Sequence, residues 1–327
     1  MSYRGAVTTA PRCDADVPAY WAALGLPGIV DAHVHVMPQR LLDRVWSYFD
    51  AAGPLVARRW PIHYRWPQDE RLAHLRGLGV RAFPTLFYAH KPGMAQGLND
   101  WGRAFAQGQR AAGHHDVLQS ATFFPEPGVL DYATRAVEEG ARVFKVHVQV
   151  GAFDPRDDLL DPVWGLLADT GTAVVVHTGS GPAPGRHTGP GPFGEVLARH
   201  PRLTAVVAHL GMPEYDDYLD LAERHPNVHL DTTMVFVDFF DGADDQTRLA
   251  RSLAPRLAGL GDKVLLGSDF PNIPYPYAHQ LEALERPGLR CGLAAGRAVG
   301  QRRPSLRCGG REGHRAGLAL LPRRARR

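Results

Sequence analysis

Residues 29–38 read IVDAHVHVMP, and this stretch decides the fold because an apolar strand runs directly into two histidines and a proline-containing loop. The same order recurs in AVVVHTGSGP (173–182), AVVAHLGMPEY (205–215) and KVLLGSDFPN (263–272). In a parallel barrel the carboxyl ends of all strands meet at one mouth. We therefore expect the polar side chains at these strand ends to converge there; they are His33, His35, His177, His209 and Asp269.

Strand-like and helix-like segments alternate along the chain. The expected strands cover residues 29–36, 80–87, 117–124, 142–149, 172–177, 204–209, 228–232 and 263–269, with amphipathic stretches of helical length between them. Eight such repeats predict an α/β fold of the (β/α)₈ TIM-barrel type. The alternative is an open doubly wound sheet. That fold calls for a Gly-rich phosphate loop after the first strand, where this chain has HVHVMP.

Three regions follow from this pattern. Residues 1–27 are expected to be an N-terminal extension or cap, with a short helix under the barrel, and residues 28–289 the barrel itself. The interval 37–78 makes the first loop after a strand unusually long, so we expect it to fold over the mouth. Arg58 in this loop is then a candidate for substrate binding.

The segment 290–327 is rich in Arg and has neither helical nor strand periodicity. A slipped reading frame and a natural disordered tail both explain it, and we expect no catalytic residue there. Its 11 arginines and single acid leave 26 basic and 33 acidic residues in 1–289, a net charge of −7. An acidic body without a basic stripe argues against nucleic-acid binding.

Composition sets further limits. The chain has 327 residues, 44% of them hydrophobic and 22% charged, which suits one large globular domain. No segment has the apolar length of a membrane span, and the N-terminus lacks the pattern of a secretory signal. The three cysteines, Cys13, Cys291 and Cys308, fit no disulfide or metal spacing, which favours a reducing cytoplasm.

The His33–His35 pair has two interpretations. Residues two apart on a strand point to the same side, so both imidazoles can face the barrel interior. They can be core histidines with hydrogen-bond partners, or they can present two ring nitrogens to one ion. Polar groups at strand ends are costly to bury unless they pair or bind something, and three further such groups at the same mouth favour the ion.

These motifs together resemble the amidohydrolase superfamily, specifically the amidohydrolase-2 branch that includes enzymes of the aminocarboxymuconate-semialdehyde decarboxylase type. The resemblance covers about residues 28–285 and rests on IVDAHVHV, VVVHTGSG, VAHLGMPEY and LLGSDFP. It implies a single divalent metal, with zinc the first expectation. The implied ligands are His33, His35, His177 and Asp269, with His209 and Asp269 as the catalytic residues that activate a water molecule.

Lys145 decides the metal count. In binuclear members of the superfamily a carboxylated lysine at the end of the fourth strand bridges two ions, and Lys145 in RVFKVHVQVG occupies that place. The alternative is a lysine that pairs with Asp269 or with substrate beside one metal. Further candidates for substrate contact are His147 on the same strand, Arg186 and His187 after the fifth strand, and Asn272 beyond Asp269.

Three functions remain open on this basis. The first is metal-dependent hydrolysis of a small-molecule amide, ester or lactone by an activated water. The second is non-oxidative decarboxylation of a small carboxylic acid at the same metal site, and the third is a barrel that binds a ligand without turnover. The expected partner is a small-molecule substrate, and a homodimer is a further prediction from the resemblance.

Overall fold

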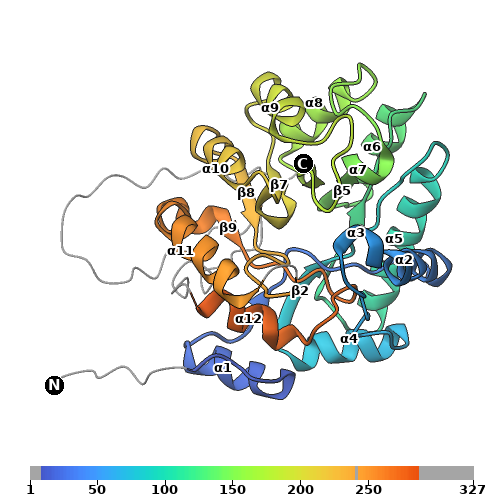
Figure 1. The fold of residues 1–327 in the computed structure, drawn as a ribbon. Helices are drawn as coiled ribbons and strands as arrows, with labels where there is room; N and C mark the ends of the chain where they lie inside the picture. The colour runs from blue at the N-terminus through green and yellow to red at the C-terminus, as the bar shows by residue number, and fades with distance from the viewer. Residues whose placement is uncertain (1–8, 240–241, 287–327) are drawn as a thin grey trace, which may run out of the picture.

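The computed structural model describes residues 9–239 and 242–286. The tail predicted over 290–327 lies outside the described residues. Parallel strands form the centre of the molecule, with helices around them (Figure 1). The strands are β1 (Ile29–Val30), β2 (Val80–Pro84), β3 (Val117–Leu118), β4 (Ser120–Ala121), β5 (Val143–His147), β6 (Ala173–His177), β7 (Ala205–Val207), β8 (Val228–Asp231) and β9 (Val264–Leu265).

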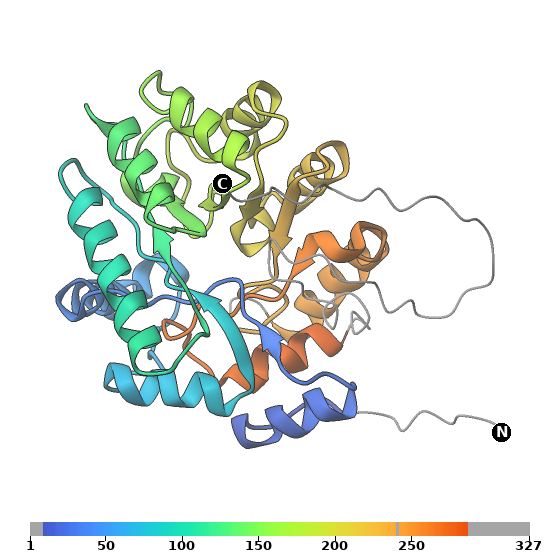
Figure 2. The ribbon, with the colours of Figure 1, turned by 180° about the vertical axis from the view of Figure 1, so that it is seen from behind.

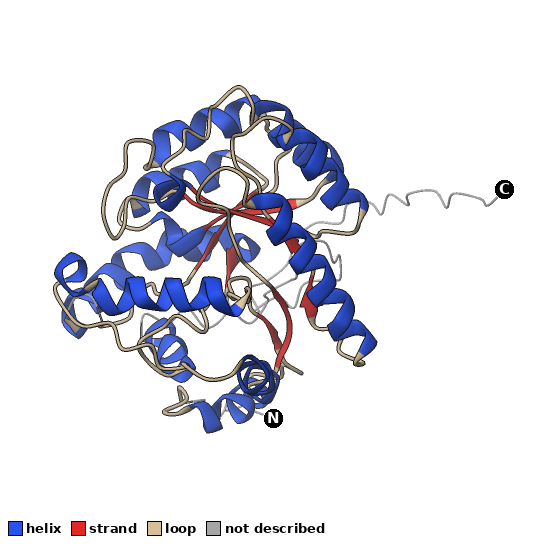
Figure 3. Cartoon of the chain, turned by 90° about the vertical axis from the view of Figure 1, so that its right-hand side faces the viewer, coloured by secondary structure: helices blue, strands red, loops and turns tan. Residues whose placement is uncertain are grey.

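Helices connect the strands and cover the outside of the barrel, as the views from behind and from the side show (Figures 2 and 3). They are α1 (Val17–Ala23), α2 (Gln39–Ala51), α3 (Gly53–Val56), α4 (Gln68–Gly77), α5 (Ala95–Ala111), α6 (Val129–Glu138), α7 (Val148–Gly151), α8 (Asp161–Thr170), α9 (Pro190–Arg199), α10 (Tyr215–Arg224), α11 (Ala243–Leu260) and α12 (Tyr277–Glu285). Short 3₁₀ helices add η1 (Asp14–Asp16), η2 (Ala208–Gly211) and η3 (Gly261–Lys263).

The strands occupy the eight positions that the sequence predicts, in chain order. β1, β2 and β3 form one parallel sheet, β4 to β9 form a second, and a single residue separates β3 from β4. The amide of Ala32 donates to the carbonyl of Leu266 (2.8 Å), and Val34 pairs with Phe270 in a parallel bridge. These contacts join the last strand to the first, so the fold is the (β/α)₈ barrel.

The first strand is shorter than predicted. Regular pairing covers only residues 29–30 of the expected 29–36. Beyond them single backbone hydrogen bonds to the neighbouring strands continue, and the side chain of Asp31 adds to them: its carboxylate accepts hydrogen bonds from the amides of His33 (3.0 Å) and Ser268 (3.2 Å). The expected fourth strand, 142–149, likewise ends at His147, where α7 begins.

Two apolar layers hold the barrel together. A small cluster fills its interior with side chains from the strands and the residues just after them: Leu86, Val143, Val175, Val206, Ala208 and Leu265. A larger cluster packs the outer face of the strands against the helices. The interior cluster lies below the strand ends, so it forms a dry floor beneath the predicted site.

The N-terminal helix α1 packs near the amino end of β2. The indole of Trp21 donates to the carbonyl of Leu78 (3.0 Å), two residues before β2. Next to α1, the carboxylate of Asp14 accepts hydrogen bonds from Tyr64 (2.5 Å), His74 (2.8 Å) and the amide of Ala278 (2.9 Å). Asp14 thereby ties η1 to the first loop, to α4 and to α12.

Replacing Asp14 with asparagine is expected to lower the free energy of unfolding by about 2 kcal/mol at neutral pH, because charge-assisted hydrogen bonds are lost. Burial raises the pKa of Asp14, but the bonds from His74 and Tyr64 outweigh it and hold the pKa below its ordinary value. The stabilisation by Asp14 is therefore fully present above the pKa that its carboxyl has in the unfolded chain. It is lost as the pH falls through the pKa of the same carboxyl in the folded protein.

Urea unfolding at pH 7 and near pH 3 measures this effect. The difference between wild type and Asp14→Asn should shrink at the lower pH, and the exposed Asp158→Asn serves as control. An equal difference in the free energy of unfolding at both pH values would contradict the stabilising role of the ionised Asp14 carboxylate.

The long first loop folds over the mouth as predicted. Its helices α2 and α3 lie there, and the loop is anchored to the segment after β9: the indole of Trp60 donates to the carbonyl of Asn272 (2.7 Å) and that of Trp46 to its side-chain oxygen (3.1 Å). Trp60 and Tyr64 are buried. These two aromatics are therefore part of the covering loop and do not form an exposed surface.

Candidate metal centre

Alternation along the strands sends the predicted side chains into the barrel. On β5, Val143 belongs to the interior cluster, so Lys145 and His147, two and four residues later, face the same way. On β6 the same argument carries His177 inward above Val175, and the register pairs it with His147. Close-packed apolar residues thus lie below, and the ionisable groups lie at the mouth.

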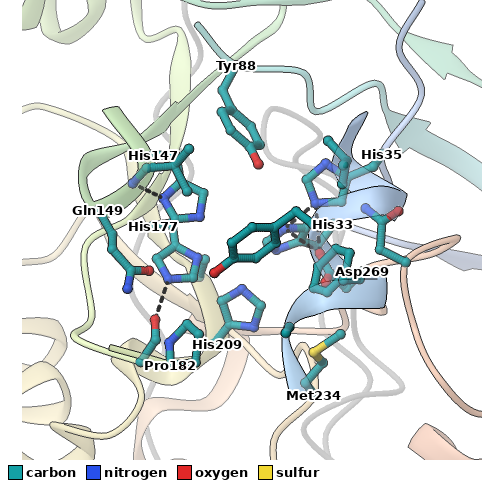
Figure 4. A pocket seen from close by; sticks show the side chains of 18 of the residues that line it. His33, His35, Tyr88, His147, Gln149, His177, Pro182, His209, Met234 and Asp269 are labelled. Carbon is teal, nitrogen blue, oxygen red and sulfur yellow. Dashed lines mark hydrogen bonds and ion pairs between the residues drawn. The ribbon is translucent and has the colours of Figure 1, made fainter. Parts of the chain in front are cut away.

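Three of the four predicted metal ligands converge on one point (Figure 4). The Nε2 atoms of His33 and His35 are 3.2 Å apart, and Oδ1 of Asp269 lies 2.7 Å from the latter and 3.3 Å from the former. All three side chains are buried. Among the described residues these are the three whose donor atoms group closely enough to hold an ion.

The hydrogen bonds behind the two rings determine which nitrogens are available. Nδ1 of His33 lies 2.9 Å from Oδ2 of Asp231, and Nδ1 of His35 lies 2.5 Å from the carbonyl oxygen of Leu86. Because both partners are acceptors, each Nδ1 carries the proton and each Nε2 presents a lone pair. Two lone pairs and a carboxylate oxygen facing one another repel unless a cation or a shared proton lies between them, and this set of nitrogen and oxygen donors fits a divalent metal.

The charge states agree with this arrangement. Burial and the nearby Lys145 lower the pKa of His33 to about 3, although Asp231 and Asp269 oppose them. His33 is therefore neutral at physiological pH and can ligate. Burial raises the pKa of Asp269, but its interactions with His35, His33 and His209 dominate and lower it to about 2. The site thus offers neutral imidazole and a carboxylate.

Asp231, at the end of β8, is a candidate site residue that the sequence reasoning missed. It is fully buried, and besides His33 it accepts hydrogen bonds from the amides of His209 (2.9 Å) and Thr233 (3.2 Å). Burial raises its pKa, but the electrostatic interaction and hydrogen bond with the His33 ring hold that pKa below its ordinary value. The signal was present in NVHLDTT, where a polar residue again follows an apolar strand.

Replacing Asp231 with asparagine is expected to weaken metal binding by about 10- to 100-fold, the usual cost of losing a carboxylate behind a ligating histidine. The asparagine amide can donate to Nδ1 of His33, which would move the imidazole proton to Nε2 and remove the lone pair. Competition with a chelator measures the affinity. An affinity equal to that of Asp158→Asn would show that Asp231 does not control the ligand.

The backbone around Asp269 is held by Asp31. The Ser268 hydroxyl donates to Oδ2 of Asp31 (2.5 Å), as does the hydroxyl of Tyr277 (3.0 Å). Asp269 itself has a φ of +67°, and its amide donates to the carbonyl of His33 (2.8 Å). This left-handed conformation costs about 1–3 kcal/mol in a non-glycine residue, and it turns the carboxylate toward the two histidines.

Lys145 lies beside the three donors, with Nζ 3.5 Å from Nε2 of His33. It is buried, and burial lowers its pKa to about 8 while Asp231 and Asp269 raise it. This place suits both interpretations from the sequence: a cation next to substrate, or an amine that carboxylation converts into a metal ligand.

His209, His177 and His147 continue the cluster as a row of imidazole rings. The ring centres of His33 and His209 are 5.1 Å apart, those of His209 and His177 4.8 Å, and His177 stacks on His147 at 3.9 Å. Nε2 of His177 donates to the carbonyl of Gly181 (3.1 Å). His177 therefore lies outside the close group of donors, and its role as a fourth ligand stays a prediction.

His209 adopts a φ of +58° at the end of its strand, and Nδ1 donates to the carbonyl of Thr233 (3.1 Å). Burial lowers its pKa despite the opposing charges of Asp269 and Asp231. The ring is thus neutral with Nε2 as the acceptor, and no described residue makes a hydrogen bond to that atom.

These residues line a cavity of about 530 Å³, a size that encloses drug-sized ligands. Its wall includes Lys145, His147 and Asn272 from the predicted substrate-contact set. Tyr88 and Arg44, which the sequence reasoning missed, also line it. Tyr88 lies in TLFYAH just beyond the second strand, whereas Arg44 lies on α2 and had no local signal.

The other predicted contacts do not reach this cavity. Arg58 places its guanidinium over the ring of Phe239, 5.3 Å from its centre. Arg186 is exposed, and His187 forms an ion pair with Asp154 (3.2 Å). Local charge in a loop indicated these three residues, but none of them is among the residues that line the cavity.

Residues 30–291 match the Amidohydrolase family profile, and the chain belongs to this family. Its members are metal-dependent enzymes, so the chain is an enzyme that acts on small molecules. No relative was found among curated proteins. No described helix is long and apolar enough to cross a membrane.

Solved structures with the same fold share little sequence. An uncharacterised TIM-barrel protein from Bordetella bronchiseptica is 18% identical with a TM-score of 0.57, over 83% of this chain and 100% of that one. A probable 2-pyrone-4,6-dicarboxylic acid hydrolase from Acinetobacter baumannii, with citric acid bound, is 11% identical (TM-score 0.52; 82% and 96% covered). A 5-carboxyvanillate decarboxylase from Novosphingobium aromaticivorans, complexed with manganese and 4-hydroxy-3-methoxy-5-nitrobenzoic acid, is 13% identical (TM-score 0.52; 86% and 93% covered).

Proposed function

We propose that the chain is a hydrolase that cleaves a small-molecule amide, ester or lactone with one divalent metal, held by His33, His35 and Asp269 with His177 as a fourth ligand. Zinc suits these nitrogen and oxygen donors. A metal ion bound there supplies Lewis acidity, which polarises a carbonyl and makes water more acidic. The small-molecule cavity and the cysteine pattern are consistent with a cytoplasmic enzyme.

The observation that carries hydrolysis is the state of His209. A neutral imidazole with its proton fixed on Nδ1 by Thr233 is a proton acceptor at neutral pH, next to His33 and Asp269. Hydrolysis needs such a base to take a proton from water and return it to the leaving group, whereas loss of CO₂ needs no activated water. Asp269 can share this step because its carboxylate lies at the same point.

Tyr88 is placed to orient the carbonyl. Its ring contacts those of His35 and His147, and its hydroxyl points into the cavity (Figure 4). Burial, with the charge of Asp269, raises the pKa of Tyr88, so the hydroxyl stays protonated and donates. A donor here can stabilise the negative charge that develops on a carbonyl oxygen.

Decarboxylation is the second candidate, supported by Lys145. A buried ammonium beside the ligands suits a substrate carboxylate, and one protein of the same fold is a manganese-containing decarboxylase. Incubating the metal-loaded enzyme with esters, lactones, amides and aromatic carboxylates separates the two reactions. We expect a new carboxylic acid from the carbonyl compounds; CO₂ release from the carboxylates without any hydrolysis would overturn the proposal.

A further inference from the structure

The first loop builds one side of the cavity almost entirely from apolar side chains. We call this set the apolar wall: Leu41, Val45, Tyr48, Phe49, Ala52, Val56 and Trp60. Apart from Tyr48, the only polar group in these side chains is the indole N–H of Trp60, and it already donates a hydrogen bond to the carbonyl of Asn272. The hydroxyl of Tyr48 is thus the main hydrogen-bonding group that the wall offers a ligand.

The wall has a fixed position relative to the metal centre. Phe49 stacks on Trp60 with ring centres 4.8 Å apart. The indoles of Trp60 and Trp46 both donate hydrogen bonds to Asn272. The backbone amide of Asn272 in turn donates to the carbonyl of Asp269 (2.8 Å). A substrate whose carbonyl lies at Asp269 can therefore place its remaining atoms against the wall.

Charge around the cavity is sparse. Of the described residues that line it, only Arg44, Lys145 and Asp269 carry a full charge. Lys145 and Asp269 belong to the metal centre, which leaves Arg44 at the rim as the one cation for a second substrate group. A substrate with several carboxylates would lose its hydration without gaining enough partners.

A polyhydroxylated substrate meets the same difficulty. Each hydroxyl that enters the cavity gives up water, and an unbonded buried hydroxyl costs free energy. Apolar atoms gain from the same transfer, about fourfold in affinity for each methylene removed from water. The wall therefore discriminates by polarity as well as by shape.

Resting on the proposed hydrolysis, we infer that the substrate is an uncharged or singly charged ester or lactone with an alkyl or aryl body that packs against the apolar wall. A polycarboxylate or a sugar lactone is not its substrate. This class differs from the dicarboxylic acid that one protein of the same fold is described as hydrolysing.

A series of γ-lactones with hydrogen, butyl or heptyl at the ring carbon next to oxygen tests the inference. We expect kcat/KM to rise at least tenfold from the unsubstituted ring to the butyl compound, with D-glucono-1,5-lactone and 2-pyrone-4,6-dicarboxylate far below both. A flat series, or a preference for either polar compound, would overturn it.

Two variants of α2 locate the effect. Val45→Asn places an amide in the wall and should lower the ratio of kcat/KM for the heptyl lactone to kcat/KM for the unsubstituted lactone about tenfold. Ser47→Asn, on the exposed face of the same helix, should leave the whole series unchanged. An alkyl preference that survives Val45→Asn unaltered would contradict the role of the wall.

Calorimetry with the matching 3-alkylcyclopentanones, which keep the shape of the lactones and have no ester or amide bond to hydrolyse, separates this inference from the proposed function. Affinity that rises with alkyl length supports the wall even if no lactone is turned over, in which case the hydrolase proposal alone fails. Turnover of lactones combined with cyclopentanone affinity that does not rise with alkyl length leaves the hydrolase and overturns the substrate class.

Discussion

The double variant His33→Ala/His35→Ala is expected to lose its metal and to lower turnover by about three orders of magnitude or more. Two of the three converging donor atoms disappear, and Asp269 with the proposed fourth ligand His177 is too small a donor set to hold an ion against water. A metal ion contributes several kcal/mol to a polarised carbonyl reaction, and about 1.4 kcal/mol corresponds to tenfold in rate. Metal analysis of the purified variant and its steady-state rate measure both effects.

A matched control is available in the exposed neighbouring pair His114 and His115. Replacing both with alanine removes the same number of imidazoles from the chain and should leave metal content and rate at wild-type levels. Full metal content in the His33→Ala/His35→Ala variant would mean that the ion is bound elsewhere. The assignment of the metal site to His33, His35 and Asp269 would then be wrong.

The second large effect is expected for His209→Ala. The variant should keep about one equivalent of metal and lower kcat about 10²- to 10⁴-fold, the usual contribution of a general base. His209 lies beside His33 without belonging to the close group of donors, so its removal leaves the ligands in place. The exposed His114→Ala again serves as the control.

Metal content separates the two interpretations of Lys145. If His209→Ala emptied the site, His209 would be a ligand. That result would support the arrangement in which carboxylated Lys145 bridges two metals. Mass spectrometry under native conditions would then detect the added carboxylate on Lys145. Retention of one metal with a low rate supports the single-metal site.

Much of the barrel and of the metal centre could be predicted from the sequence because both depend on local patterns. Apolar runs that end in a polar residue give the strand positions, and the parallel order of the strands brings their ends together. His33, His35 and Asp269 were predicted as ligands on this basis, and the structure brings their donor atoms together. In the barrel the lengths of the regular strands differed, and at the metal centre His177 lies outside the close group of donors.

What could not be predicted depends on contacts between distant segments. Asp31 looked like one residue of a strand, but its bonds to Ser268 and Tyr277 exist only once the barrel closes. The sequence gives no direction for the loop that carries Arg186, and it turns that residue toward solvent. Arg44 became a candidate only when α2 packed over the mouth.

The most direct test of the central claim is the metal stoichiometry of the wild-type protein together with its metal-dependent rate. The account predicts about one equivalent of a divalent ion, loss of hydrolysis when a chelator removes it, and recovery of hydrolysis when zinc or manganese is returned. Undiminished hydrolysis by protein shown to be free of metal would contradict the account.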